Sequence, residues 1–193
     1  MNVFIQTITD LFLDREEFLR MYSPMNYSVK FVEFFSILLG SISLSVSAVL
    51  MNPPYSSGYV VLIVILSIGN FFFLSLVSTF ASYFIDFNAK NLIKSGDFPT
   101  LLSSARCLNI VFVFSSPIAL VLSFAGFPSF SGYILVLIIT LSFYILYFSI
   151  YANELYGMGL FRTFRNITSS IFSIVYIPLM ILVFFILNII III

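Results

Sequence analysis

The chain has 193 residues, of which 61% are apolar and 8% are charged, whereas roughly a quarter of the residues in an ordinary soluble domain are charged. This composition excludes a soluble globular domain and a disordered chain. Eight basic residues balance eight acidic ones, so no basic field exists to hold nucleic acid. The chain has no His and one Cys, Cys107, which excludes an intrachain disulfide and metal sites built on those ligands. The class that remains is an all-α, polytopic integral membrane protein whose first partner is the lipid bilayer.

Residues 1–30 are expected to form a cytoplasmic amphipathic leader. They are acidic and have no basic start before an apolar stretch, so they do not form a signal peptide. Apolar side chains recur at helical spacing in this segment, which predicts an amphipathic helix. The helix either lies on the membrane surface or packs on the protein's own cytoplasmic face, and the two positions are compatible. The apolar residues are Phe4, Ile8, Leu11, Phe12, Phe18 and Leu19.

Residues 31–193 are expected to form one transmembrane domain of five helices. A bilayer core about 30 Å thick needs about 20 apolar residues per helix. Short loops rich in Pro, Ser and Gly separate the first span from the second and the third from the fourth, which predicts two helical hairpins. The segment Asp86–Arg106 is expected to be a cytoplasmic loop. The five predicted spans cover about 34–51, 59–85, 107–125, 133–153 and 166–193.

The basic residues all lie on one side of this map. Three precede the first span, three lie between the second and third, and two lie between the fourth and fifth. The positive-inside rule therefore predicts that the N-terminus and both charged loops are cytoplasmic and that the C-terminus is external.

Two asparagines are the polar residues of most interest within the spans. Asn70 lies near the middle of the second span, where it must bond to another helix or line a cavity, so it is either structural or a contact for a substrate. Asn109 lies close to the cytoplasmic edge of the third span and is expected to reach water. Stripes of serine in the first two spans indicate close helix packing, with a solute path lined by hydroxyls as the alternative.

Two prolines and a set of charges complete the candidate residues. Pro117 and Pro178 lie within the third and fifth spans and are expected to kink them, because proline removes a backbone donor. Three acids and three bases lie at the cytoplasmic boundary, where they either pair across the bundle or anchor it in the headgroup layer. These six are Glu33, Asp86, Glu154, Arg106, Arg162 and Arg165. No motif of a hydrolase, a nucleotide-binding loop or a zinc protease is present, so we expect no catalytic, cofactor or metal site.

Several short motifs follow one another along the chain: Leu11–Phe18, Lys94–Phe98 followed by Leu101-Leu102, Ser115-Ser116-Pro117, Ala152–Met158, and Pro178. Their order resembles the Yip (Ypt-interacting protein) family, in its short prokaryotic five-span form. The resemblance covers about residues 11–187. It implies a compact five-helix bundle with a cytoplasmic N-terminus in a prokaryotic plasma (inner) membrane. Eukaryotic members act in vesicle traffic and contact Rab-type GTPases, but this chain lacks their Asp-Leu-Tyr-Gly-Pro element, so the resemblance implies the fold more than that role.

Two functional hypotheses follow. The first is a non-enzymatic membrane protein of the Yip type that organises the membrane or recruits protein partners through its cytoplasmic face. That face would consist of the leader, Asn88–Thr100 and Glu154–Arg165. The second is a small-solute or lipid transporter, or a subunit of one. A water-filled polar cavity that reaches Asn70 would favour the second. The sequence carries no information on the oligomeric state.

Overall fold

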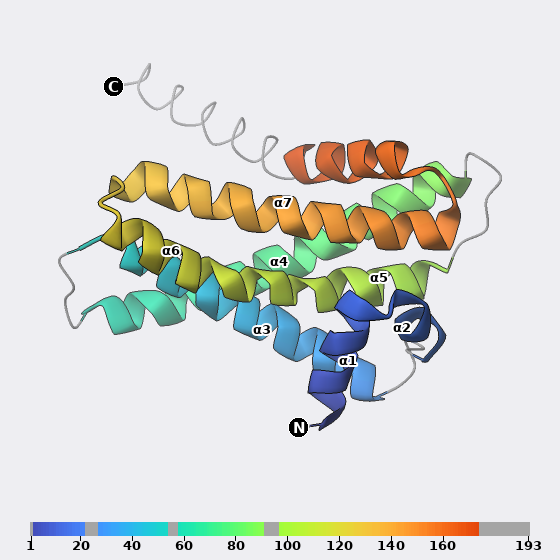
Figure 1. The fold of residues 1–193 in the computed structure, drawn as a ribbon, viewed down its shortest axis with the longest axis horizontal. Coiled ribbons are helices and arrows are strands. Elements are labelled where there is room, and N and C mark those ends of the chain that lie inside the picture. The colour runs from blue at the N-terminus through green and yellow to red at the C-terminus, as the bar shows by residue number, and fades with distance from the viewer. Residues whose placement is uncertain (1, 22–26, 54–57, 91–96, 174–193) are drawn as a thin grey trace, which may run out of the picture.

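The computed structural model describes residues 2–21, 27–53, 58–90 and 97–173, and every regular element in these ranges is a helix (Figure 1). The all-α expectation is therefore confirmed for the described part of the chain. The helices are α1 (Asn2–Leu13), α2 (Arg15–Met21), α3 (Tyr27–Leu50), α4 (Gly58–Lys90), α5 (Phe98–Cys107), the 3₁₀ helix η1 (Leu108–Phe114), α6 (Ser115–Phe124) and α7 (Ser129–Tyr156). A last helix covers residues 160–173.

Four stretches of the described chain are long and apolar enough to cross a membrane. They are Val29–Leu50, Gly58–Lys90, Phe98–Phe124 and Ser129–Tyr156. These four correspond to the first four predicted spans, and each is longer than predicted. The predicted fifth span, 166–193, lies mostly outside the described residues. Its described beginning is helical, and the helix starts earlier than predicted, at residue 160.

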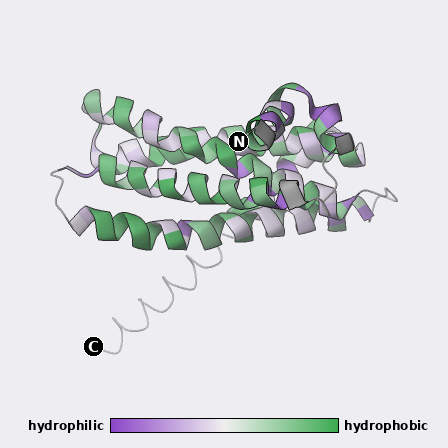
Figure 2. Ribbon diagram, turned by 90° about the horizontal axis from the view of Figure 1, so that it is seen from below, coloured by the Kyte–Doolittle hydropathy of each residue, from purple (hydrophilic) through white to green (hydrophobic). Residues whose placement is uncertain are grey.

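The helices form an elongated bundle in which α3 contacts most of the others. It packs against α4, α5, η1 and α6, and more lightly against α1 and α7 (Figure 1). One end of the bundle carries Glu33, Asp86, Arg106 and Glu154, and we call it the charged end. The opposite end holds residues 51–53, which follow α3, and the turn that follows α6. Figure 2 shows hydrophilic residues concentrated towards one end and in the N-terminal helices, while apolar residues dominate the rest.

The two predicted hairpins are present, since α3 packs against α4 and α6 packs against α7. The connection between α6 and α7 is shorter than predicted. Gly126 ends α6 with a positive φ of 74°, and its N–H donates to the carbonyl of Ser123 at 3.1 Å. Glycine adopts this conformation without the steric penalty of a Cβ, which is how many helices terminate. The next helix then begins at Ser129.

The segment that follows α4 was wrongly expected to be a loop up to Arg106. Helix α4 continues to Lys90, and α5 already begins at Phe98. Pro99 lies in the first turn of α5, where its missing N–H costs nothing. Small side chains then allow close packing, and Ser103, Ser104 and Ala105 are buried in the bundle. The low hydropathy of this stretch led to the prediction of a loop, whereas packing against the other helices stabilises a helix here.

Pro117 lies in the first turn of α6, directly after the 3₁₀ segment η1. A proline at this position cannot donate to the carbonyl four residues before it, which belongs to Val113. The Ser43 hydroxyl of α3 donates to that carbonyl instead, at 2.8 Å. The expected kink is therefore a 3₁₀ segment that ends before Pro117, and a neighbouring helix supplies the donor for the Val113 carbonyl. Pro178 lies outside the described residues.

The N-terminal helices pack on the charged end of the bundle. Leu11 and Phe18 are buried, with 0% and 1% of their surface exposed. The Tyr151 hydroxyl of α7 donates to the Leu11 carbonyl at 2.6 Å, and the Phe12 and Tyr147 rings meet edge to face with centroids 5.0 Å apart. The leader therefore packs on the protein itself, which is one of the two compatible positions expected for it.

Candidate functional site

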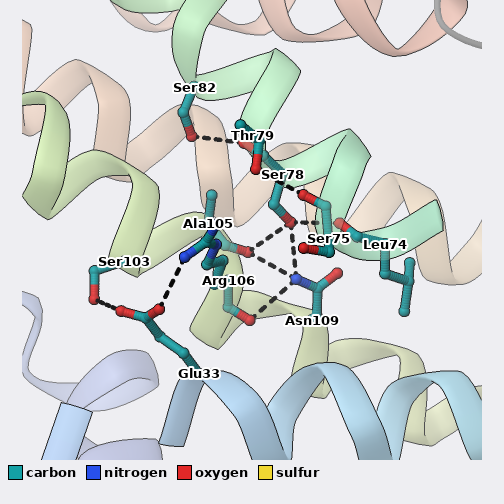
Figure 3. Close-up of polar contacts among 10 residues, drawn as sticks. All are labelled: Glu33, Leu74, Ser75, Ser78, Thr79, Ser82, Ser103, Ala105, Arg106 and Asn109. Atoms are coloured by element: carbon teal, nitrogen blue, oxygen red, sulfur yellow. Dashed lines mark hydrogen bonds and ion pairs between the residues drawn. The ribbon is translucent and has the colours of Figure 1, made fainter. Parts of the chain in front are cut away.

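Glu33 and Arg106 form an ion pair between α3 and α5 at the charged end. Their closest atoms, Oε2 and Nη1, are 3.4 Å apart. The Ser103 hydroxyl donates to the other carboxylate oxygen of Glu33 at 2.5 Å. Figure 3 shows these three side chains converging from the two helices. Because the Glu33 side chain is only 12% exposed, the pair lies in a partly dry position, where removing one partner costs more than it does at a surface.

Asp86 joins α4 to α7. It is 6% exposed, and one of its carboxylate oxygens accepts a hydrogen bond from the Tyr156 hydroxyl at 2.8 Å. The other oxygen pairs with Lys90 Nζ at 2.6 Å, one helical turn along α4. A buried carboxylate with a partner on each oxygen holds the two helices together.

Glu154 pairs with Arg15 of the leader, with Oε1 and Nη1 3.5 Å apart. Glu154 therefore pairs with the leader and not with a base of the last described helix. Arg162 and Arg165 are both exposed, and neither forms an ion pair with any residue that the structure describes. Of the six boundary charges, Glu33 and Arg106 therefore pair with each other across the bundle, whereas Asp86 and Glu154 pair with bases outside this set, Lys90 and Arg15. The anchoring of Arg162 and Arg165 in the headgroup layer stays a prediction.

Asn70 bonds to another helix, as one of its two expected roles requires. Its amide Nδ2 donates to the Ser45 hydroxyl oxygen of α3 at 3.0 Å. The Ser45 hydroxyl in turn donates to the Ser41 carbonyl at 2.8 Å. This short relay connects the middle of α4 to the backbone of α3, which is a structural use of the amide.

Asn109 was expected to reach water, and this expectation is wrong, because the residue is 1% exposed. Its amide donates to the Ser78 hydroxyl at 2.9 Å and to the carbonyls of Ala105 and Arg106 at 3.2 Å and 3.0 Å. The Tyr144 hydroxyl of α7 lies 3.2 Å from the Ser78 hydroxyl. Figure 3 shows Asn109 facing Ser78 across the helix interface. This node joins α4, α7 and the third span in the interior of the bundle.

The sequence analysis missed the tyrosines of α7. Tyr144, Tyr151 and Tyr156 each tie α7 to another element through their hydroxyl groups. Tyr144, Phe148 and Tyr151 are four and three residues apart and are all buried, so they share one face of the helix. This helical spacing was the signal available in the sequence.

Two cavities of the bundle are lined almost entirely by apolar side chains. One, of about 520 Å³, lies between α3 and α4 and includes Phe34 and Phe71 in its lining. The other, of about 600 Å³, lies between α1, η1 and α7 and includes Phe12 and Tyr147. Asn70 and Asn109 line neither of them.

The described residues contain no group of three or more His, Cys, Asp or Glu side chains that could hold a metal ion. Comparison with protein-family models, with curated proteins and with solved structures finds no match to this chain. The resemblance to the Yip family therefore rests on the motifs of the sequence alone and stays a prediction.

Proposed function

We propose that this chain is a non-enzymatic integral membrane protein of the Yip type, which organises the membrane or recruits protein partners through the charged end of its bundle. In this proposal the charged end is cytoplasmic, the N-terminus lies on the same side, and the C-terminus is external. The membrane is a prokaryotic plasma membrane, and the predicted fifth span completes the domain.

The observation that supports the proposal most strongly is the use of the polar groups inside the bundle. Asn70, Asn109 and Ser43 each bond to a neighbouring helix. Polar groups that are hydrogen-bonded to a neighbouring helix are not available to bind a transported solute. The two described cavities are lined almost entirely by apolar side chains.

The charged end offers a surface of the opposite kind. The leader is fixed there by the Arg15–Glu154 ion pair and the Tyr151 hydrogen bond, so its exposed side presents a defined shape. Glu16 and Asp97 are exposed on this end, as is Lys90, whose side chain is 70% exposed. Conversely, the described loop after α6 carries no charge. Charged, exposed groups at one end give specificity to a contact with another protein.

Photo-crosslinking in living cells tests the proposal. A photoreactive amino acid is placed at Glu16, at Lys90 and, as the control at the uncharged end, at Phe130, which is 79% exposed. We expect protein adducts of the same mass at positions 16 and 90 and none at position 130. Adducts that are no more abundant at positions 16 and 90 than at position 130 would contradict the proposal.

A further inference from the structure

The first two turns of the helix over residues 160–173 repeat an aromatic–arginine pair. The repeat consists of Phe161-Arg162 and Phe164-Arg165. Both arginines are exposed and have no carboxylate partner among residues 2–21, 27–53, 58–90 and 97–173. By contrast, Arg15, Lys90 and Arg106 are each paired with an acid. No acid of the described chain therefore neutralises the charge of these two arginines.

The orientation of this helix is set by its buried side. Thr163 and Ile167 are 0% exposed, so the helix packs on the bundle through that side. Residues three apart share a face of a helix, which places the two arginines together and the two phenylalanines on the neighbouring face. Phe161 and Phe164 are 80% and 42% exposed. The surface that faces away from the bundle thus combines two cations with two aromatic rings.

The depth of this surface is set by the turn that precedes it. Gly157 and Gly159 have positive φ angles of 57° and 89°, and the Gly159 N–H donates to the Asn153 side-chain oxygen at 2.8 Å. This tight turn starts the new helix beside the last turn of α7, at Asn153. Figure 1 shows the helix, drawn in orange-red, running back beside α7. The arginines therefore lie at the level where the apolar part of α7 ends.

We infer that this surface, formed by Phe161, Arg162, Phe164 and Arg165, binds the headgroups of anionic phospholipids in the leaflet at the charged end. A guanidinium group bonds to phosphate through two parallel N–H donors, and an aromatic ring at this depth packs between the first carbons of the acyl chains. Because neighbouring acids do not neutralise the arginines, the surface prefers a lipid with net negative charge to a zwitterionic one. The inference rests on the proposed function and names an anionic lipid as one partner of the cytoplasmic face.

The absence of Trp from the chain allows a local measurement of this preference. In the full chain with Phe161→Trp, the new indole is the only tryptophan and lies within the surface. The protein is reconstituted in bilayers in which either phosphatidylglycerol or phosphatidylcholine carries brominated acyl chains, which quench a tryptophan they touch. The matched control is Phe124→Trp, because Phe124 is 85% exposed at the uncharged end of α6. The ratio of the two quenching curves gives the relative binding constant of the two lipids at each position.

We expect phosphatidylglycerol to be preferred at position 161 by about fivefold, the effect of one basic residue near an anionic surface, or by more if both arginines contribute. The preference should disappear in Arg162→Gln/Arg165→Gln, shrink in 1 M salt, survive millimolar inorganic phosphate, and be absent at position 124. Equal quenching by both lipids at position 161 would overturn the inference, as would a preference that persists in the double variant. Loss of the preference to inorganic phosphate would show a site for the free anion and would overturn the assignment to a lipid. The crosslinking result at Glu16 and Lys90 does not depend on these arginines, so the two failures are distinguishable.

Discussion

At the scale of single residues, the two asparagines of the bundle differ in how much their hydrogen bonds contribute to stability. Asn70 is half-buried and makes one bond between helices, whereas Asn109 is buried and donates to three acceptors. Hydrogen bonds between membrane helices contribute about 0.6 kcal/mol on average, while stranding buried polar partners costs about 1–3 kcal/mol. We therefore expect Asn109→Leu to lower the unfolding free energy more than Asn70→Leu. Equilibrium unfolding in mixed micelles measures both, and equal losses would contradict the arrangement described.

Gly40 and Gly69 form a matched pair for the close approach of α3 to the third span. A Cβ added at Gly40 would lie 2.6 Å from the carbonyl oxygen of Asn109, whereas one at Gly69 would have nothing within 4 Å. Alanine is the better helix former by about 0.5–1 kcal/mol. We expect Gly40→Ala to lower the melting temperature and Gly69→Ala to leave it unchanged or raise it. A Gly40→Ala protein as stable as Gly69→Ala would show that the two helices are farther apart.

Ser43 and Pro117 are predicted to be energetically coupled. The Ser43 hydroxyl donates to the Val113 carbonyl, whose usual backbone donor four residues on is missing because residue 117 is proline. Ser43→Ala should therefore be costly alone and much less costly in a Pro117→Ala background, where an N–H is restored. Ser47→Ala is the control, since the Ser47 hydroxyl donates to its own helix at Leu44. A double-mutant cycle measures the coupling, and strictly additive losses for Ser43 and Pro117 would exclude it.

At the scale of helices, one hydroxyl group contributes to the attachment of the leader to α7, beside the Arg15–Glu154 ion pair and the ring contacts. Tyr151→Phe removes the donor to the Leu11 carbonyl and keeps the ring. Tyr147→Phe is the control, because Tyr147 contacts Phe12 through its ring and its hydroxyl bonds to no residue that the structure describes. We expect trypsin to cleave the leader faster in Tyr151→Phe than in Tyr147→Phe. Equal cleavage rates would mean that the hydroxyl does not hold the leader.

The sequence predicts well the helices that can be recognised from the length of their apolar run alone. The first, second and fourth spans are evident because long apolar runs are confined to a bilayer. Helix α5 was missed because Ser103, Ser104 and Arg106 lower its mean hydropathy. The small side chains of Ser103 and Ser104 are buried against other helices, and only the folded structure shows which helices those are. The burial of Asn109 was missed for the same reason, because the segment before it, Asp86–Arg106, was expected to be a loop in water.

At the scale of the whole molecule, the distribution of charge was predictable and the pairing within it was not. The positions of the basic residues along the chain define one charged end, which the helices bring together. Which acid meets which base depends on the rotation and contact of the helices, so Glu154 meets Arg15 of the leader instead of Arg162. The proposed function is based on the difference between an interior whose polar groups bond to neighbouring helices and a charged end whose exposed groups can contact partners.

Labelling of a cysteine at position 70 tests the closed interior most directly. Asn70→Cys is made in a Cys107→Ser background, which removes the single native thiol, and intact membranes are treated with a water-soluble thiol reagent. Ser131→Cys, exposed at the start of α7 at the uncharged end, gives the rate for a site in water. Ile65→Cys, 61% exposed on α4, gives the rate for a site facing lipid. We expect position 70 to react as slowly as position 65. Labelling at position 70 as fast as at position 131 would contradict the account and would favour a transporter with a water-filled path to Asn70.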